Sequence, residues 1–464
     1  MSARTRALAA GFLGSLLLAG CTDGGAAPPQ PPSTSSASAS TGRIDLTFGV
    51  YGSADEVAGY DDMVTEFNSL SEESSVSVVS WPDRDRAMAE LGSSEDLPDV
   101  FLISRGDLAT FQRDGQVQPV DELLDARGVD FGDGYSRDAL LAFSLENRLQ
   151  CMPYGISPMV IYLNTDLVDF DRMRARGLPA PAPGADSETD TDTDPEPPRA
   201  WSFEQFAAAA EFATRPRRRT RGVSIEASLG GLAPFIVSGG GTVFDSDSEP
   251  TSLAFSDEAS RNALETTLAL LRNAQVTLSP EQLAEAPALD WFERGQVAMI
   301  AGFRELVPDL RQVQGLTFDV MPIPVIESSG TIGDITGLCL SADTANAPEA
   351  ADFLAHALSE ASVTAVARAG YLVPANVAVA ASDQFLQPGR LPANSAIFNT
   401  AVRDIYIPPL ISDVAALEEI VAPSIAELIS RPGAMDAQTI EEITAVIDEQ
   451  SRLVLSPDEV SPTP

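Results

Sequence analysis

The stretch from Ile44 to Trp81 reads IDLTFGVYGSADEVAGYDDMVTEFNSLSEESSVSVVSW. Residues 44–50 alternate apolar and polar side chains, which is typical of a strand that buries one face. Apolar side chains then recur at helical spacing, namely Tyr60, Met63, Val64 and Phe67. Strand patterns return at residues 76–81 and 99–104. Strands that alternate with helices predict an α/β fold with a parallel sheet.

Three loops follow these predicted strands, and they are the first place to look for a ligand. In open α/β sheets, ligands bind beyond the carboxyl ends of the strands. This rule indicates Gly52–Ser53, the loop with Trp81 and Asp83, and the loop with Ser104, Arg105 and Asp107. Asp107 can accept two hydrogen bonds from adjacent hydroxyl groups of a ligand, or it can cap the helix that begins near Leu108. Both interpretations stay open at this point.

The composition excludes several classes of protein. The 464 residues carry a net charge of −39, and every basic residue except one histidine is an arginine. Nucleic-acid binding needs a basic footprint, so it is not expected. A single histidine and three cysteines nearly exclude a His/Cys zinc site, and no cofactor or metal is predicted. Strong self-repulsion favours a monomer.

The first 20 residues are predicted to be a secretory signal. Arg4 and Arg6 precede an apolar run at residues 7–19, which is too short to span a bilayer as a mature helix. Cys21 directly follows Leu-Ala-Gly, which resembles the lipobox of bacterial lipoproteins. The resemblance implies that the Cys21 sulfur is diacylated and that the mature protein is anchored to the outer face of a membrane. An ordinary secretory signal beside a chance cysteine is the alternative.

Residues 21–42 contain Gly, Ala, Pro, Ser and Thr with almost no large apolar side chain, so they are predicted to be a flexible tether. Residues 184–198 are predicted to be a solvated acidic loop, and residues 456–464 a disordered tail. The basic run Arg215–Arg221 either faces water and the acidic loop or offers a docking patch to an anionic partner. The two remaining cysteines, Cys151 and Cys339, form either a disulfide or two neighbouring buried thiols.

Four stretches, in this order, resemble the family 1 extracellular solute-binding proteins of ABC importers, which include maltose-binding proteins. They are Leu97–Phe101; Met152–Leu167 with Trp201–Phe206; Phe292–Phe303; and Gly337–Ser341 with Ala347–Leu354 and Gly370–Ala375. The resemblance covers about residues 44–450. It implies a type II-like periplasmic-binding-protein fold, in which two discontinuous α/β lobes close around a ligand in the cleft between them. The expected lobes are 43–156 with 323–380, and 157–322 with 381–455.

The resemblance also suggests which side chains line the cleft. Polar contacts are expected at the strand-end loops already named, Ser53 among them, at Ser157 and at Asp334 and Gly337, although an exposed loop is equally compatible with the last two. The remaining candidates lie in the matching motifs or in a glycine-rich turn: Tyr154, Gly240, Gly241, Phe303, Arg304 and Tyr371. Trp81 and Trp291 are either stacking platforms or core residues.

The chain departs from the sugar-binding pattern in its aromatic content, which is 6%. Arg304 stands where relatives carry a stacking tryptophan, and this change favours a small sugar over a long oligosaccharide. An arginine in the cleft would also suit an acidic sugar or another anion. The leading hypothesis is therefore a carbohydrate receptor that delivers its ligand to an ABC permease. The alternatives are a sensing or cell-envelope interaction protein of the same fold, and an envelope glycosidase, for which no catalytic motif is recognisable.

Overall fold

The computed structural model describes residues 42–92, 94, 96–132, 134–182 and 200–457. The described residues from Arg43 onward belong to one compact unit. Within the described ranges, no helix is long and apolar enough to cross a membrane. The predicted signal peptide, Cys21, nearly all of the tether, the acidic loop and all but two residues of the predicted tail lie outside the described residues.

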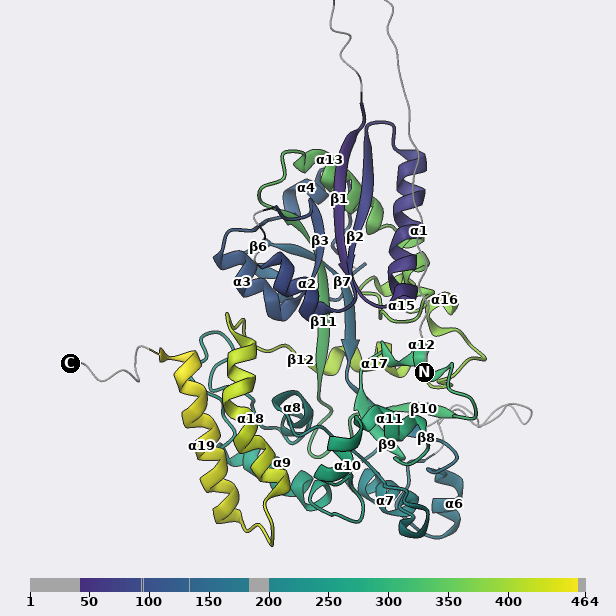
Figure 1. Cartoon of the computed structure of the whole chain (residues 1–464), viewed down its shortest axis with the longest axis vertical. Coiled ribbons are helices and arrows are strands. Elements are labelled where there is room, and N and C mark those ends of the chain that lie inside the picture. The colour runs from purple at the N-terminus through teal and green to yellow at the C-terminus, as the bar shows by residue number, and fades with distance from the viewer. Residues whose placement is uncertain (1–41, 93, 95, 133, 183–199, 458–464) are drawn as a thin grey trace, which may run out of the picture. The chain divides into compact units, whose positions relative to one another are not determined.

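The larger sheet has seven strands and is mixed (Figure 1). Strand β1 (Ile44–Tyr51) pairs in parallel with β2 (Ser74–Trp81) and β3 (Val100–Ser104). Strand β11 (Thr331–Ser341) is antiparallel to β3, and β7 (Cys151–Pro158) is antiparallel to β11. The prediction of a parallel sheet is therefore right for β1–β3 and for the short pairing of β11 with β12, and wrong for the pairings of β11 with β3, β4 and β7, because β11 returns from a distant part of the chain. Short strands β4 (Val117–Gln118) and β12 (Ile405–Tyr406) also pair with β11.

Helix α1 (Ala54–Leu70) packs beside this sheet and buries the face that the apolar spacing predicts. Tyr60, Met63 and Phe67 are at most 6% exposed in one core with Phe48. Ser53 begins the helix by accepting a hydrogen bond from the Glu56 backbone N–H at 3.3 Å. The other elements of this lobe are α2 (Arg84–Leu91), a 3₁₀ turn η1 (Arg105–Asp107), α3 (Leu108–Arg113), α4 (Asp121–Asp125), α5 (Arg137–Ala142), β5 (Ser144–Leu145), β6 (Arg148–Leu149), α13 (Ala347–Ala357) and α14 (Glu360–Ala367).

The second lobe is built on a three-stranded antiparallel sheet in the order β10–β8–β9. These strands are β8 (Val160–Asn164), β9 (Met299–Gly302) and β10 (Phe318–Pro322). Two apolar cores flank this sheet and draw on residues 159–323, 373–398 and 411–447. The helices are α6 (Phe170–Ala175), α7 (Phe203–Ala213), η3 (Pro216–Arg218), α8 (Leu229–Ser238), α9 (Glu258–Leu271), α10 (Pro280–Glu285), α11 (Ala288–Glu293), α12 (Leu306–Leu310), α16 (Asp383–Leu386), α17 (Ile397–Thr400), η4 (Ala401–Asp404), α18 (Val414–Ser430) and α19 (Ala437–Leu455). Helix α15 (Val377–Ala380) packs with the core of the first lobe, in which Val379 is buried.

Strands β7 and β11 run side by side and connect the two lobes (Figure 1). Their first-lobe ends are joined by a disulfide between Cys151 and Cys339, which are cross-strand partners. At the other end, the Met159 backbone N–H donates to the Ile332 carbonyl just before β8 begins. The first core takes residues 46–156 and 335–379, so its members come from two separated parts of the chain. The boundaries proposed for the two lobes stay predictions.

Candidate functional site

The loop after β1 carries two polar groups that the local backbone holds in place. Gly52 has φ +147°, and a Cβ at this position would lie 2.2 Å from Oε2 of Glu56. Glycine is therefore required here, since it lets the Glu56 side chain fold back over the end of β1. The Tyr51 hydroxyl is buried at the same place, and it has no hydrogen-bond partner among the described residues.

The loop after β3 contributes an ion pair. Arg84 at the start of α2 donates from Nε to Oδ2 of Asp107 at 3.0 Å and from Nη2 to Oδ1 at 2.5 Å. Asp107 makes no side-chain cap to α3, so the capping interpretation is wrong. Burial raises the pKa of Asp107, and the Arg84 charge opposes that rise. A carboxylate held by a bidentate arginine has a fixed orientation and retains free acceptor positions.

Asp334 lies beside this ion pair on β11, directly across from Ser157 of β7. Ser104 Oγ donates to its Oδ1 at 3.5 Å, a long contact. Solvent reaches the Asp334 side chain, yet protein surrounds it on most sides, and this desolvation raises its pKa.

Glu305, between β9 and α12, brings a third carboxyl group from the second lobe. Desolvation by the surrounding protein, together with the negative charges of Asp334 and Glu56, raises its pKa to about 8. Glu56 behaves in the same way, since burial and Asp334 raise its pKa to about 7. We call Glu56, Asp334 and Glu305 the acidic cluster. Near neutral pH it holds both protonated and ionised carboxyl groups, and can both donate hydrogen bonds to hydroxyl groups and accept them.

A second group of polar side chains lies where β12 joins β11. The Tyr406 hydroxyl donates to Oδ1 of Asp247 at 3.1 Å, and the Arg105 charge acts on the same hydroxyl. Burial lowers the pKa of Arg105 to about 10, and its Nε has no hydrogen-bond partner among the described residues. Arg105 therefore retains donor capacity next to the site.

Several of the predicted residues come together around the acidic cluster. They are Ser53, Ser104, Asp107, Asp334 and Tyr371, the last through a contact with Ser53 and a hydrogen bond to Asp309 Oδ1 at 3.4 Å. Arg105 lies instead with Tyr406 in the second group. Ser157 is 8% exposed and accepts the Arg304 backbone N–H at 3.0 Å, so it links β7 to the second lobe.

The other predicted residues have structural surroundings of their own. Trp81 donates to Glu90 and lines a recess of about 510 Å³ with Leu97 and Pro98. Asp83 caps α2 through the Arg86 N–H. Tyr154 is buried against Met63, Trp291 donates to the Ala286 carbonyl, and the Phe303 carbonyl accepts from Tyr162. Gly337 lies under the Phe143 ring, and Gly241 packs against Ser260. Gly240 is an exposed turn residue with φ +75° after α8.

Arg304 is also placed differently from the prediction. Its side chain is fully buried, with the guanidinium carbon 4.7 Å from the Phe385 ring centroid and 5.0 Å from that of Phe398. A side chain held between two core rings does not present its charge to a solvent-filled cleft. This placement removes the main argument for an anionic ligand.

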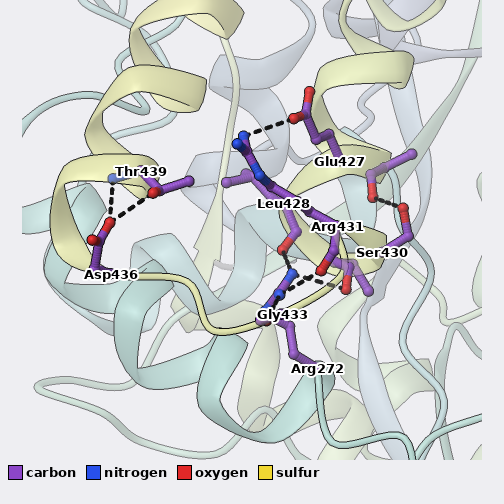
Figure 2. Close-up of polar contacts among 10 residues, drawn as sticks. Arg272, Glu427, Leu428, Ser430, Arg431, Gly433, Asp436 and Thr439 are labelled. Atoms are coloured by element: carbon purple, nitrogen blue, oxygen red, sulfur yellow. Dashed lines mark hydrogen bonds and ion pairs between the residues drawn. The ribbon is translucent and has the colours of Figure 1, made fainter.

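A different recess, of about 550 Å³, lies between α9 and the segment joining α18 to α19. Figure 2 shows Arg272 there, reaching the end of α18. Its guanidinium donates to the carbonyls of Leu428, Ile429, Arg431 and Gly433 at 2.7–3.1 Å. Since these bonds satisfy the last carbonyls of a helix, Arg272 has a structural role. No residue of the acidic cluster lines this recess.

The sequence analysis missed Tyr51, Glu56 and Glu305. Glu56 stands three residues after Ser53, a spacing that indicates an ordinary helix start. Glu305 follows Arg304 in a motif whose family resemblance drew attention to its aromatic position. Only the folded chain brings these two residues together, because 249 positions separate them in the sequence (305 − 56).

The sequence profile of the bacterial extracellular solute-binding protein family matches residues 62–393. No curated protein matches the chain. Among solved structures, the chain is similar to an ABC substrate-binding protein from Listeria monocytogenes in complex with cycloalternan, with TM-score 0.72 and 16% identity over 88% of this chain and 99% of that one. It is also similar to the GacH receptor of Streptomyces glaucescens, which has been solved unliganded and with acarbose (TM-score 0.68, 18% identity, coverage 90% and 99%). A third similar structure is the maltotriose-binding protein of Thermus thermophilus, with TM-score 0.63 and 18% identity over 87% of this chain and 99% of that one. The predicted two-lobed fold is confirmed.

Proposed function

Because this chain belongs to the bacterial extracellular solute-binding proteins, we propose that it captures a small carbohydrate between its lobes and delivers it to the permease of an ABC importer. The observation that carries the proposal is the acidic cluster, in which the charges of Glu56 and Asp334 act on Glu305 of the other lobe. The fold is shared with structures solved with cycloalternan, acarbose and maltotriose, which makes a sugar the first class of ligand to test.

The chemistry of the cluster suits hydroxyl groups. Ionised carboxylates accept hydrogen bonds from neighbouring hydroxyls, protonated carboxyls donate to sugar oxygens, and the Tyr51 hydroxyl adds a donor that has no hydrogen-bond partner among the described residues. Polar groups that are left unpaired on closure cost free energy, so such a site discriminates between ligands by their hydroxyl pattern. Trp81 and Trp291 contact other parts of the protein, which supports a small sugar rather than a long oligosaccharide.

The mechanism follows from the two crossing strands. A ligand that contacts Asp334 and Glu305 together favours the closed arrangement of the lobes, and the permease recognises that arrangement. We propose that the protein works as a monomer, that it is tethered to the membrane through diacylated Cys21, and that no covalent chemistry takes place in the site.

The test is calorimetric titration of the full-length chain in detergent with a panel of mono-, di- and trisaccharides and acidic sugars. For the sugar that binds, Asp334→Asn and Glu305→Gln should each weaken affinity about 10- to 100-fold, as expected when a desolvated polar partner is lost. Asp62→Asn is the matched control, since Asp62 is exposed on α1 and its side chain forms no hydrogen bond or ion pair with the described residues.

Selective binding that is lost in both cluster variants and kept in Asp62→Asn would support the proposal. Binding that survives both changes would place the ligand elsewhere. Absence of binding to every sugar by a folded, ligand-free protein would contradict the carbohydrate assignment.

A further inference from the structure

The surroundings of the acidic cluster carry more negative than positive charge. Four carboxyl groups come together there, namely those of Glu56, Asp107, Glu305 and Asp334. Among the described residues, the positive charge that acts on these carboxyl groups is that of Arg84. Arg84 is committed to Asp107, to which it donates two hydrogen bonds at 2.5 and 3.0 Å. The three members of the acidic cluster form no ion pair within the residues that the structure describes, so no side chain there balances their charge directly.

The backbone brings carboxyl groups of both lobes to one place. Asp334 on β11 is the cross-strand partner of Ser157 on β7. The Ser157 Oγ accepts the Arg304 backbone N–H at 3.0 Å, so Glu305, the next residue, starts beside the same pair of strands. The Ser104 Oγ, at the end of β3, lies 3.5 Å from Asp334 Oδ1. Asp334 and Glu305 are both exposed, so a ligand can reach them from solvent.

The Tyr51 hydroxyl is a second, independent feature that calls for a ligand. It is shielded from solvent and has no hydrogen-bond partner among the described residues. Desolvation and the negative charges of Asp334, Asp107 and Glu56 raise its pKa well above the usual value, so the hydroxyl keeps its proton and lies among these carboxyl groups. An unpaired buried hydroxyl costs free energy, which a ligand recovers by offering it an oxygen.

The electrostatics favour a ligand that is positively charged. Desolvation raises the pKa of Glu305 to about 8 and that of Glu56 to about 7, and the charge of Asp334 adds to both effects. Like charges in a desolvated site oppose one another's ionisation. A neutral ligand leaves this repulsion in place, whereas a cation between the carboxyl groups removes it and lets them ionise.

We propose that the solute is a basic sugar, in which a protonated amino group lies next to a hydroxyl or ring oxygen. The ammonium group donates to Asp334 of β11 and to Glu305 of the second lobe, and the neighbouring oxygen accepts from the Tyr51 hydroxyl. This inference rests on the proposed function, because it names the class of carbohydrate that the same site takes. A bare polyamine would balance the charge but would leave the Tyr51 hydroxyl without an acceptor.

The test compares sugars that differ in one amino group. The full-length chain in detergent is titrated calorimetrically with glucosamine, glucose and N-acetylglucosamine, and with chitobiose before and after removal of its acetyl groups. The titrations are made at about pH 6.5, where an aliphatic amine is protonated. The free amine should bind about 10- to 100-fold more tightly than its neutral partner, as expected for hydrogen bonds between charged groups.

Proton release gives a second readout that affinity alone does not. At this pH Glu305 and Glu56 are largely protonated, so a bound ammonium group should drive their ionisation and release about one to two protons. Repeating the titration in buffers with different ionisation enthalpies measures this number. A neutral sugar should release none.

Two variants and one control assign the effect to the acidic cluster. Glu305→Gln and Asp334→Asn should each reduce the preference for the amine over its neutral partner at least about tenfold, because the amide carries no charge. Glu305→Gln should also lower the proton release by about one. Asp62→Asn should leave both quantities unchanged, since Asp62 is exposed on α1.

The possible outcomes separate this inference from the proposed function. Neutral sugars that bind as tightly as their amines, or amine binding without proton release, would overturn the basic-sugar assignment and leave the carbohydrate receptor standing. Binding of spermidine in preference to every sugar, or no binding to any sugar, would contradict both.

Discussion

Replacement of both Cys151 and Cys339 by alanine should remove a large share of the free energy of unfolding. The disulfide joins positions 188 residues apart, and closing a loop of that length in the unfolded chain corresponds to about 5 kcal/mol. Measured values usually fall below this limit because unfolded chains retain structure, so we expect a loss of about 3–5 kcal/mol.

The assay is equilibrium unfolding in urea, followed by circular dichroism. The variant should unfold at lower urea concentration and with a steeper slope, since its unfolded state is more expanded without the crosslink. Either single replacement already breaks the bond, so the double variant should be little less stable than the single ones. A loss below about 1 kcal/mol, or single losses that add up, would refute the loop-entropy reasoning.

Three further predictions concern other parts of the molecule. Burial raises the pKa of Glu305 to about 8 and that of Glu56 to about 7. The stability that these two groups contribute should therefore be greatest below pH 4.5 and should be lost as the pH rises through 7 and 8. Glu305→Gln should flatten a plot of thermal midpoint against pH. A Cβ on Gly155 would lie 2.3 Å from Leu372 Cδ1 and 2.7 Å from Thr336 Oγ1. Gly155→Ala should therefore lower the free energy of unfolding in urea by about 1–3 kcal/mol. An unchanged free energy of unfolding would mean that the crossing strands shift easily to make room for the methyl group. Ser53→Ala removes the cap of α1 and should cost about 1 kcal/mol, whereas Ser53→Asp should retain most of the stability.

Local patterns predicted the elements that depend on neighbouring residues. The spacing of Tyr60, Met63 and Phe67 identified the buried face of α1, and the strand-end rule found Ser53, Ser104 and Asp107 because all three follow parallel strands. The antiparallel position of β11 could not be predicted in this way, since its partner β3 lies more than 200 residues earlier in the chain.

Glu305 and Arg304 illustrate the same limit in the site. They are neighbours in sequence, but Glu305 meets Asp334 and Glu56 while Arg304 turns into the core between two phenylalanine rings. Packing against α16 and α17 turns Arg304 into the core and leaves the adjacent Glu305 outside it. The family motif gives the place of the turn and not the direction of its side chains.

The pairing of β7 with β11 also determines where the molecule can bend. Thr336 pairs with Gly155 and Gly337 with Pro153, so Tyr154 is an extra residue that divides the ladder in two. The disulfide holds together the half of the ladder that belongs to the first lobe. The other half, in which Gly155–Pro158 pair with Gly333–Thr336, contains Ser157 and Asp334 and has no crosslink. We expect this lower half to be the pivot, and hydrogen exchange should be faster there than beside Cys339. Asp334 would then lie at the pivot itself, where a small local displacement becomes a larger displacement at the far ends of the two lobes.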